Sequence, residues 1–163
     1  MPKTRKIALG TAAAGLLAGT VALTGTPATA APAPATVTKS IQVYSDDTNL
    51  DEYAGVDVWT RDSRHSWQVW DLTQLHDGSY TIRGRHFGKC LSATSRGQKV
   101  TQSPCNSGNL AQRWTLDTTA DTTTIESLKF KGDVLQAHGM DQPVYLQAKG
   151  TGRAAQQWGL YVK

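Results

Sequence analysis

Carboxylates and indole rings gather in one stretch of the sequence, between residues 46 and 67. Paired carboxylates are the groups that hydrolyse glycosidic bonds, whereas carboxylates beside an aromatic ring can hold a sugar without cleaving it. The candidate acids are Asp46, Asp47, Asp51, Glu52 and Asp57, and the candidate rings are Trp59 and Trp67. All of these acids fall in one short segment, which suits a loop face better than a catalytic cleft.

The remaining reactive side chains do not form a catalytic set. The four histidines are isolated from one another in the sequence, and no serine or cysteine nucleophile has a recognisable partner pattern. A metal site near Cys90 and Cys105 would need more ligands than His86 alone supplies. We therefore expect a protein that is not an enzyme, with no metal and no cofactor.

Residues 1–30 have the features of a secretory signal peptide. Lys3, Arg5 and Lys6 precede an apolar run that ends in the small-residue signal Ala28-x-Ala30. An uncleaved membrane anchor is the alternative, because the run is almost long enough to span a bilayer. The small-residue site favours cleavage, and residues 31–36 then form an Ala/Pro linker. We expect a secreted, extracellular protein with no stable membrane association after cleavage.

Cleavage changes the charge balance and the redox context. The chain has 17 basic and 13 acidic residues, and three of the basic residues lie in the signal peptide, so 14 remain. A nearly neutral mature chain is poor evidence for a nucleic-acid partner, and we expect none. In an oxidising compartment, Cys90 and Cys105 are expected to form a disulfide. About 130 residues suit a single domain with one core.

A short motif recurs three times at constant spacing. The pattern Gln-x-Trp occurs at Gln68 and Trp70, at Gln112 and Trp114, and at Gln156 and Trp158. The tryptophans are 44 residues apart in both intervals. The same shift aligns further glycine, leucine, alanine and valine positions of the second and third repeats. The first repeat is less similar in its front half, which we expect to contain a small insertion or deletion.

Each repeat has the pattern of short β-strands. Segments such as SIQVY, SYTIR and VYLQA are rich in β-branched and aromatic residues and are separated by Gly, Asp and Asn. A β-propeller is excluded because one repeat alone has a Trp-Asp pair and because three blades are too few to close a ring. Three units of four short strands predict an all-β domain that hides its edges by closing into a threefold barrel.

The three Gln-x-Trp motifs resemble those of the ricin-B-type β-trefoil lectins of the secreted bacterial type. The second repeat strengthens the resemblance with RHFGKCL (Arg85–Leu91) and VTQSPC (Val100–Cys105). The resemblance covers residues 37–163 and implies a β-trefoil with repeats at about 37–79, 80–123 and 124–163. It also implies structural roles for the motif residues, which are Trp70, Gln112, Trp114, Gln156 and Trp158. Trp158 would then belong to the core, and the C-terminal strand would close the barrel.

The usual sugar pocket of this family is mostly replaced. It takes an Asp two residues after the first Cys position, an aromatic residue two before the second, and an Asn before the motif Gln. With a uniform shift of 44, these positions hold Ser92, Ser103 and Ala111 in repeat two, Gln136, Gln147 and Ala155 in repeat three, and Thr48, Trp59 and Trp67 in repeat one. His138 and Tyr145 lie near the repeat-three positions without an assigned role.

Repeat one is the best candidate for a surviving pocket. It retains the aromatic Trp59 with Asp57 two residues before it, and a slip of one residue would bring Asp47 to the acidic position. The resemblance therefore implies carbohydrate contacts by Asp47, Asp57, Trp59 and Gln68. Two alternatives stay open: Trp59 and Trp67 pack at the barrel rim, and Asp46 pairs with Arg61 where repeat two has its disulfide.

The sequence favours a monomeric, secreted lectin-like module that binds a glycan or polysaccharide with low affinity. The alternative is a sugar-inactive trefoil that binds a secreted protein partner, for instance as an inhibitor of a secreted hydrolase. Loss of the pocket residues within a retained framework favours this alternative, because fold alone does not determine function.

Overall fold

The computed structural model describes residues 33–62, 66–150 and 153–162. The expected signal peptide, residues 1–30, lies outside these ranges. Within them, no helix is both long and apolar enough to cross a membrane. The described chain consists of β-strands and three short 3-10 turns.

Six strands pair in a closed ring, in the order β1-β4-β5-β8-β9-β13 and back to β1. Their bounds are β1 Thr36–Val43, β4 Trp70–Gln74, β5 Tyr80–Gly84, β8 Trp114–Thr119, β9 Thr122–Ser127 and β13 Trp158–Val162. All pairs are antiparallel, and β13 closes the barrel against β1 from Lys39 opposite Val162 to Val43 opposite Trp158. The last strand is therefore held along its length by the first.

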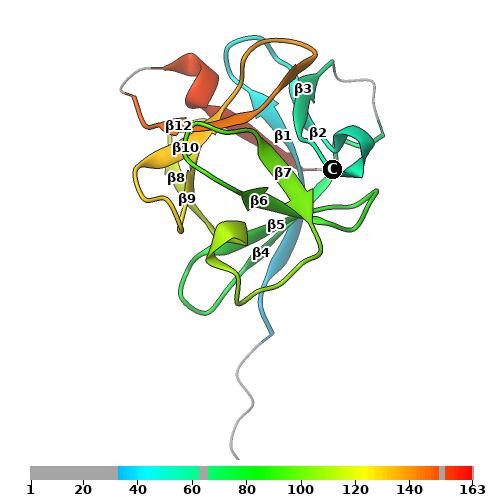
Figure 1. Ribbon diagram of the computed structural model, residues 1–163, viewed down its shortest axis with the longest axis vertical. Helices are drawn as coiled ribbons and strands as arrows, with labels where there is room; N and C mark the ends of the chain where they lie inside the picture. Colours follow the sequence, from blue (N-terminus) through cyan, green and yellow to red (C-terminus); the bar gives the residue numbers. More distant parts are fainter. Residues whose placement is uncertain (1–32, 63–65, 151–152, 163) are drawn as a thin grey trace, which may run out of the picture. The chain divides into compact units, whose positions relative to one another are not determined.

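Three further hairpins cap the barrel, one from each repeat (Figure 1). They are β2 (Asn49–Asp51) with β3 (Trp59–Arg61), β6 (Cys90–Ala93) with β7 (Val100–Ser103), and β10 (Asp133–Gln136) with β12 (Tyr145–Ala148). A short strand, β11 (Gln142–Pro143), adds to β3 and links the third repeat to the first. A six-stranded barrel with three capping hairpins confirms the predicted β-trefoil.

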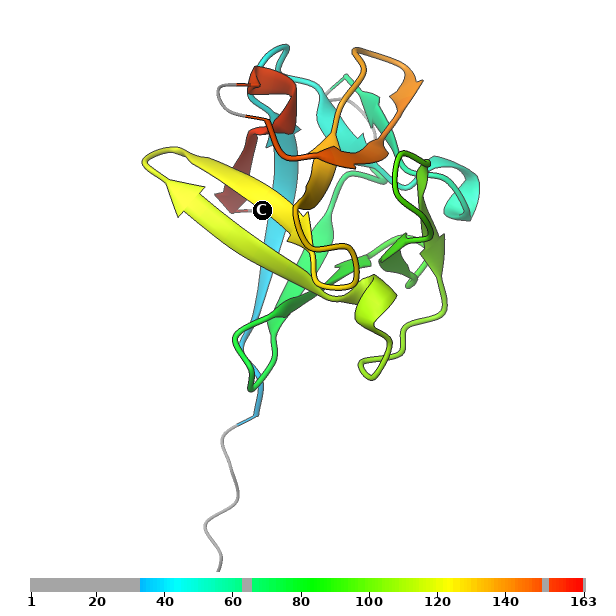
Figure 2. The same ribbon diagram turned by 60° about the vertical axis from the view of Figure 1, so that its left-hand side comes forward.

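The strands arise from the alternation of buried and exposed side chains. In β9, Thr123, Ile125 and Ser127 are buried, whereas the residues between them are partly exposed, because successive side chains on a strand point to opposite faces. Its partner β8 extends with it as a long hairpin that projects from the barrel (Figure 2). One buried stripe on each strand is enough to line a small closed barrel.

The core of the barrel contains the three motif tryptophans. Trp70, Trp114 and Trp158 are each 0% exposed and belong to one hydrophobic cluster with the inward side chains of the barrel strands. Buried aromatic rings supply a large share of the apolar area in a small core. The expected disulfide between Cys90 and Cys105 is present and ties β6 to the loop after β7.

Candidate functional site

The indole groups of the motif tryptophans define equivalent positions in the three repeats. Each indole N–H donates to the backbone carbonyl of a leucine: Trp70 to Leu50 at 2.9 Å, Trp114 to Leu91 at 3.2 Å, and Trp158 to Leu135 at 3.2 Å. The separation along the chain is 23 residues in repeats two and three but 20 in repeat one. Repeat one is therefore shorter in this segment, and a uniform shift of 44 is wrong for its front half.

The corrected register assigns the acidic pocket position of repeat one to Asp51. Asn49 lies opposite Arg61 in its hairpin, as Cys90 lies opposite Ser103 in repeat two. Asp51, two residues after Asn49, is therefore equivalent to Ser92 and Gln136. Sequence reasoning considered Thr48 and Asp47 for this place and missed Asp51. The local triplet Asn49-Leu50-Asp51, compared with Cys90-Leu91-Ser92, was the signal that could have found it.

The corrected register also explains why the ion pair between Asp46 and Arg61, one of the open alternatives, is absent from the described structure. Asp46 accepts hydrogen bonds from both the backbone N–H and the hydroxyl of Thr48, at 3.1 and 2.6 Å. Arg61 lies instead near Asp141, with 3.3 Å between Nε and Oδ1. This alternative does not hold because Asn49, not Asp46, occupies the position that corresponds to Cys90.

Gln68 holds the base of the repeat-one pocket together. Its side chain is 4% exposed, and its Nε2 donates to Asp51 Oδ2 at 3.3 Å and to the backbone carbonyl of Asp62. Asp51 is fully buried. A buried amide must be satisfied by internal partners, and these bonds connect the motif with β2 and with the residue that follows β3. Gln68 therefore supports the pocket from within.

Trp59 is a half-buried ring with one face covered. The rings of Trp59 and Tyr53 stack with centroids 4.3 Å apart, and the guanidinium of Arg61 lies 5.7 Å from the Tyr53 centroid. The indole nitrogen of Trp59 is buried without a hydrogen-bond partner in the described structure. The Trp59 ring is therefore covered by Tyr53 on one face and keeps part of its surface exposed.

Asp57 and Trp59 share a face, whereas Asp47 lies on a separate turn. Val58 between the first two is fully buried, so its extended neighbours on either side point away from the core. Asp47 has a left-handed backbone with a φ of 58°, and its carbonyl accepts from Gln42 Nε2 at 2.9 Å. No hydrogen bond joins the Asp47, Asp57 and Trp59 side chains in the described ranges.

Trp67 packs at the junction between repeats one and two. Packing at the barrel rim was an alternative that the sequence left open for this residue. Its ring stacks on His86 at 5.1 Å and meets the edge of Phe87 at 5.5 Å. Beneath them, the fully buried Glu52 accepts from the backbone N–H groups of His86 and Phe87 at 2.8 and 3.1 Å. Burial raises the pKa of the Glu52 carboxyl, and these two hydrogen bonds oppose the rise.

Repeat three combines an amide, an imidazole and a phenol at its pocket position. Gln136 lies opposite Tyr145 in the β10–β12 hairpin, as Asp51 lies opposite Trp59. The amide nitrogen of Gln136 is 3.4 Å from His138 Nε2, and the His138 ring meets the Tyr145 ring edge-on at 4.8 Å. The motif residue Gln156 donates to Gln136 Oε1 at 2.8 Å. In repeat three, as in repeat one, the motif glutamine thus donates to the pocket residue from below. The acceptor is the neutral amide of Gln136 where repeat one has the Asp51 carboxylate.

The equivalent region of repeat two is closed by small residues. Ser92 and Ala111 are buried, and the Gln112 amide donates to Ser103 Oγ at 2.6 Å and to the Pro104 carbonyl at 3.0 Å. These positions place no aromatic ring and no carboxylate in the pocket. Repeat two therefore contributes the disulfide framework and no evident sugar contact.

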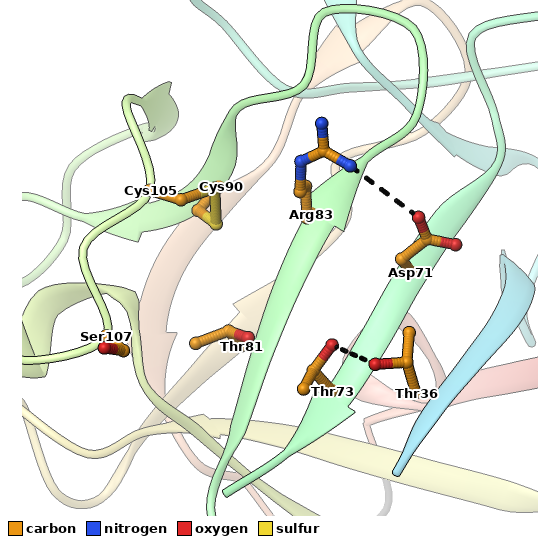
Figure 3. Close-up of a pocket in the computed structure, with 8 residues that line it drawn as sticks. All are labelled: Thr36, Asp71, Thr73, Thr81, Arg83, Cys90, Cys105 and Ser107. Carbon is orange, nitrogen blue, oxygen red and sulfur yellow. Dashed lines mark hydrogen bonds and ion pairs between the residues drawn. A yellow bond between two sulfur atoms is a disulfide. The ribbon is translucent and has the colours of Figure 1, made fainter. Parts of the chain in front are cut away.

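A hollow of about 440 Å³ lies beside the disulfide on β4 and β5 (Figure 3). The hydroxyls of Thr36 and Thr73 are 2.7 Å apart across it, and an ion pair of 3.9 Å joins Arg83 to Asp71. Its polar groups largely satisfy one another, and none of the described residues that line it is aromatic. The residues described here contain no cluster of three or more His, Cys, Asp or Glu side chains that could hold a metal ion.

Residues 39–158 match the ricin-type β-trefoil lectin domain. The chain belongs to this family. Among curated proteins, none matches the sequence significantly. Solved structures do: the designed threefold-symmetric protein ThreeFoil is similar at 25% identity and a TM-score of 0.69, over 77% of this chain and 99% of that one.

Two natural lectins show the same fold at lower identity. The Rhizoctonia solani agglutinin is 17% identical with a TM-score of 0.69, and the match covers 82% of this chain and all of the agglutinin. The Polyporus squamosus lectin, solved with a sialylated epitope, is 17% identical with a TM-score of 0.64, over 76% of this chain and 48% of that one. This ricin-type domain thus spans the agglutinin fully and about half of the Polyporus lectin.

Proposed function

We propose that this ricin-type domain is a secreted, monomeric carbohydrate-binding module that holds a glycan or polysaccharide with low affinity at repeat one. The observation that carries the proposal is the outward face shared by Asp57 and Trp59 on either side of the buried Val58. The exposed part of the Trp59 ring stacks on the C–H side of a sugar ring, and the Asp57 carboxylate accepts hydrogen bonds from its hydroxyls, with Asp47 as a further acceptor from its separate turn. Gln68 and Asp51 support this surface from below.

Low affinity follows from the exposure of these groups. Each hydrogen bond to a sugar replaces one to water and contributes about 1 kcal/mol net. Stacking on a ring that is already covered on one side adds a comparable amount. Dissociation constants for a simple sugar should therefore be roughly millimolar to high-micromolar.

A glycan array followed by calorimetric titration of the best ligand tests the proposal. Trp59→Ala should abolish binding, while Tyr145→Ala, the matched change at the equivalent hairpin position of repeat three, should leave it unchanged. Loss of binding with Tyr145→Ala alone would move the site to repeat three, where Gln136, His138 and Tyr145 are together. A blank array with a specific protein captured from the secretome would instead support the sugar-inactive, protein-binding alternative.

Secretion is a separate part of the proposal. It is supported by the signal-like residues 1–30 and by the disulfide, which persists in oxidising compartments. N-terminal sequencing of protein recovered from the culture medium should begin after Ala30. Retention of the full chain in the membrane fraction would contradict this.

A further inference from the structure

The most exposed aromatic rings of the described chain lie outside the three family pockets. Tyr44 is 61% exposed and Tyr161 is 53% exposed, whereas Phe87, at the rim of repeats one and two, is 37% exposed. The two tyrosines line one groove of about 600 Å³, a volume within the roughly 300–1,000 Å³ range of ligand sites. Single apolar residues scattered over a surface need no explanation, whereas exposed rings that line the same groove indicate a binding site.

The groove lies between the projecting hairpin of Figure 2 and the C-terminal strand. The hairpin contributes Thr118, Ala120, Asp121 and Thr123, and β13 contributes Leu160 beside Tyr161. The β9 and β13 strands that form its walls are directly paired, with Thr123 opposite Trp158. The groove is therefore built on barrel strands.

The Tyr161 ring packs against the backbone, and the segment that carries Tyr44 is anchored by a backbone hydrogen bond. The Tyr161 ring lies across Gly159 so closely that a Cβ at Gly159 would be 2.6 Å from the Tyr161 ring. The backbone N–H of Tyr44 donates to the carbonyl of Gln157 at 2.9 Å, which attaches the turn after β1 to the segment before β13. Such anchoring lowers the entropy that a ligand must remove when it binds.

The remaining groups of the groove select the chemistry of the ligand. The hydroxyls of Thr118 and Thr123 are 2.9 Å apart, and the Asp121 carboxylate lies beside them among the lining residues. Hydroxyls and a carboxylate match the hydroxyls of a sugar, and tyrosine faces match its C–H side. Among the described residues that line the groove there is no Lys, Arg or His, so an acidic ligand would meet the Asp121 charge without a compensating cation from them.

We propose that this groove, centred on Tyr44 and Tyr161, binds a segment of a neutral polysaccharide at a site separate from the family pockets. The inference shares its ligand class with the proposed function and shares none of its residues. Two sites on one module strengthen retention on a polymer that reaches both, because the second contact becomes intramolecular.

Native gel electrophoresis of the mature protein in gels that contain a soluble polysaccharide tests this inference. The gels contain arabinoxylan, galactomannan or mixed-linkage β-glucan, with polygalacturonate as the acidic comparison. We expect retardation in at least one neutral gel and none in polygalacturonate. Tyr44→Ala and Tyr161→Ala should each weaken the affinity about 2- to 10-fold, whereas Tyr44→Phe should retain it because the ring remains.

Phe87→Ala is the matched control, since it removes an exposed ring outside the groove, and thermal unfolding checks that each variant is folded. Weakened retardation by the tyrosine variants with unaltered retardation by Trp59→Ala would support the groove and contradict the repeat-one site. The inference is overturned if no neutral gel retards the unmodified protein, or if both tyrosine variants migrate as it does. A glycan-array signal lost with Trp59→Ala would, in that case, leave the proposed function standing.

Discussion

The Gln68 amide donates to the Asp51 carboxylate at 3.3 Å, and the Gln156 amide donates to the Gln136 side-chain oxygen at 2.8 Å in the same relative position. In both repeats the motif glutamine therefore orients an acceptor at the pocket position. Gln112 donates instead to Ser103 and to the carbonyl of Pro104. The motif glutamine thus has two roles: it braces the chain in every repeat, and it supports a polar pocket residue in repeats one and three.

Trp114→Ala should destabilise the domain strongly. The Trp114 side chain is fully buried, and truncation of a buried tryptophan costs about 3–5 kcal/mol of unfolding free energy. Such a loss is a large fraction of the stability of a small domain. Urea denaturation followed by circular dichroism measures it. Trp59→Ala is the control, because that ring is only partly buried, and an equal loss in both variants would contradict the separation of core and surface tryptophans.

Gln156→Ala should destabilise the third repeat by about 1–3 kcal/mol, because it leaves buried groups without partners. Gln156 accepts from the Gly150 N–H at 2.8 Å and donates to Gln136 at 2.8 Å and to the Ala148 carbonyl at 3.0 Å. The neighbouring Gln157→Ala serves as the control, since its side chain makes no hydrogen bond in the described structure. Equal midpoints of urea unfolding for both variants would show that these bonds contribute nothing.

Replacement of both cysteines by serine should lower the unfolding free energy by about 3 kcal/mol, the value for a closed loop of about 15 residues. Cys90 and Cys105 are joined and are separated by 15 positions. Intact mass after alkylation without reduction should show no modified thiol in the native protein. A thiol that is freely alkylated at Cys90 would refute the pairing.

The stability of the protein should respond to pH through Glu52. A raised pKa means that the folded state binds the proton more tightly than the unfolded state, so this contribution is present at low pH. It is lost as the pH rises from the ordinary carboxyl value through the raised pKa of folded Glu52. Urea unfolding at several pH values should show the wild type losing stability relative to Glu52→Gln over this window. Parallel profiles for the two proteins would be inconsistent with a raised pKa.

Several features of the fold could be predicted from local sequence patterns. The constant spacing of Trp70, Trp114 and Trp158 indicated three equivalent units, and the alternation of buried residues within short segments indicated strands. The tryptophan spacing and the alternation of buried residues are each defined by a few residues and occur in several copies. Substitutions elsewhere in the chain therefore leave both patterns recognisable. The pairing of Cys90 with Cys105 followed from composition and from an expected oxidising compartment.

The candidate site was less accessible to sequence reasoning. The shortening of repeat one between Leu50 and Trp70 leaves the motif in register and displaces the pocket positions, so a uniform shift selected Thr48 and Asp47 where the structure has Asp51. The missing residues are divided between a hairpin and a loop. Among the described residues, neither the hairpin nor the loop has a periodic pattern of buried residues from which the shortening could have been recognised.

The sequence by itself determined the number of repeats, the all-β class, the motif residues and the disulfide, because these depend on spacing and residue type along the chain. The tertiary structure alone decided which side chains meet: Tyr53 on Trp59, Glu52 under His86 and Phe87, and Tyr44 beside Tyr161 in one groove. Barrel closure brings Tyr44 and Tyr161 together from opposite ends of the domain. Contacts of this kind depend on strand register and ring closure, which are global properties of the fold.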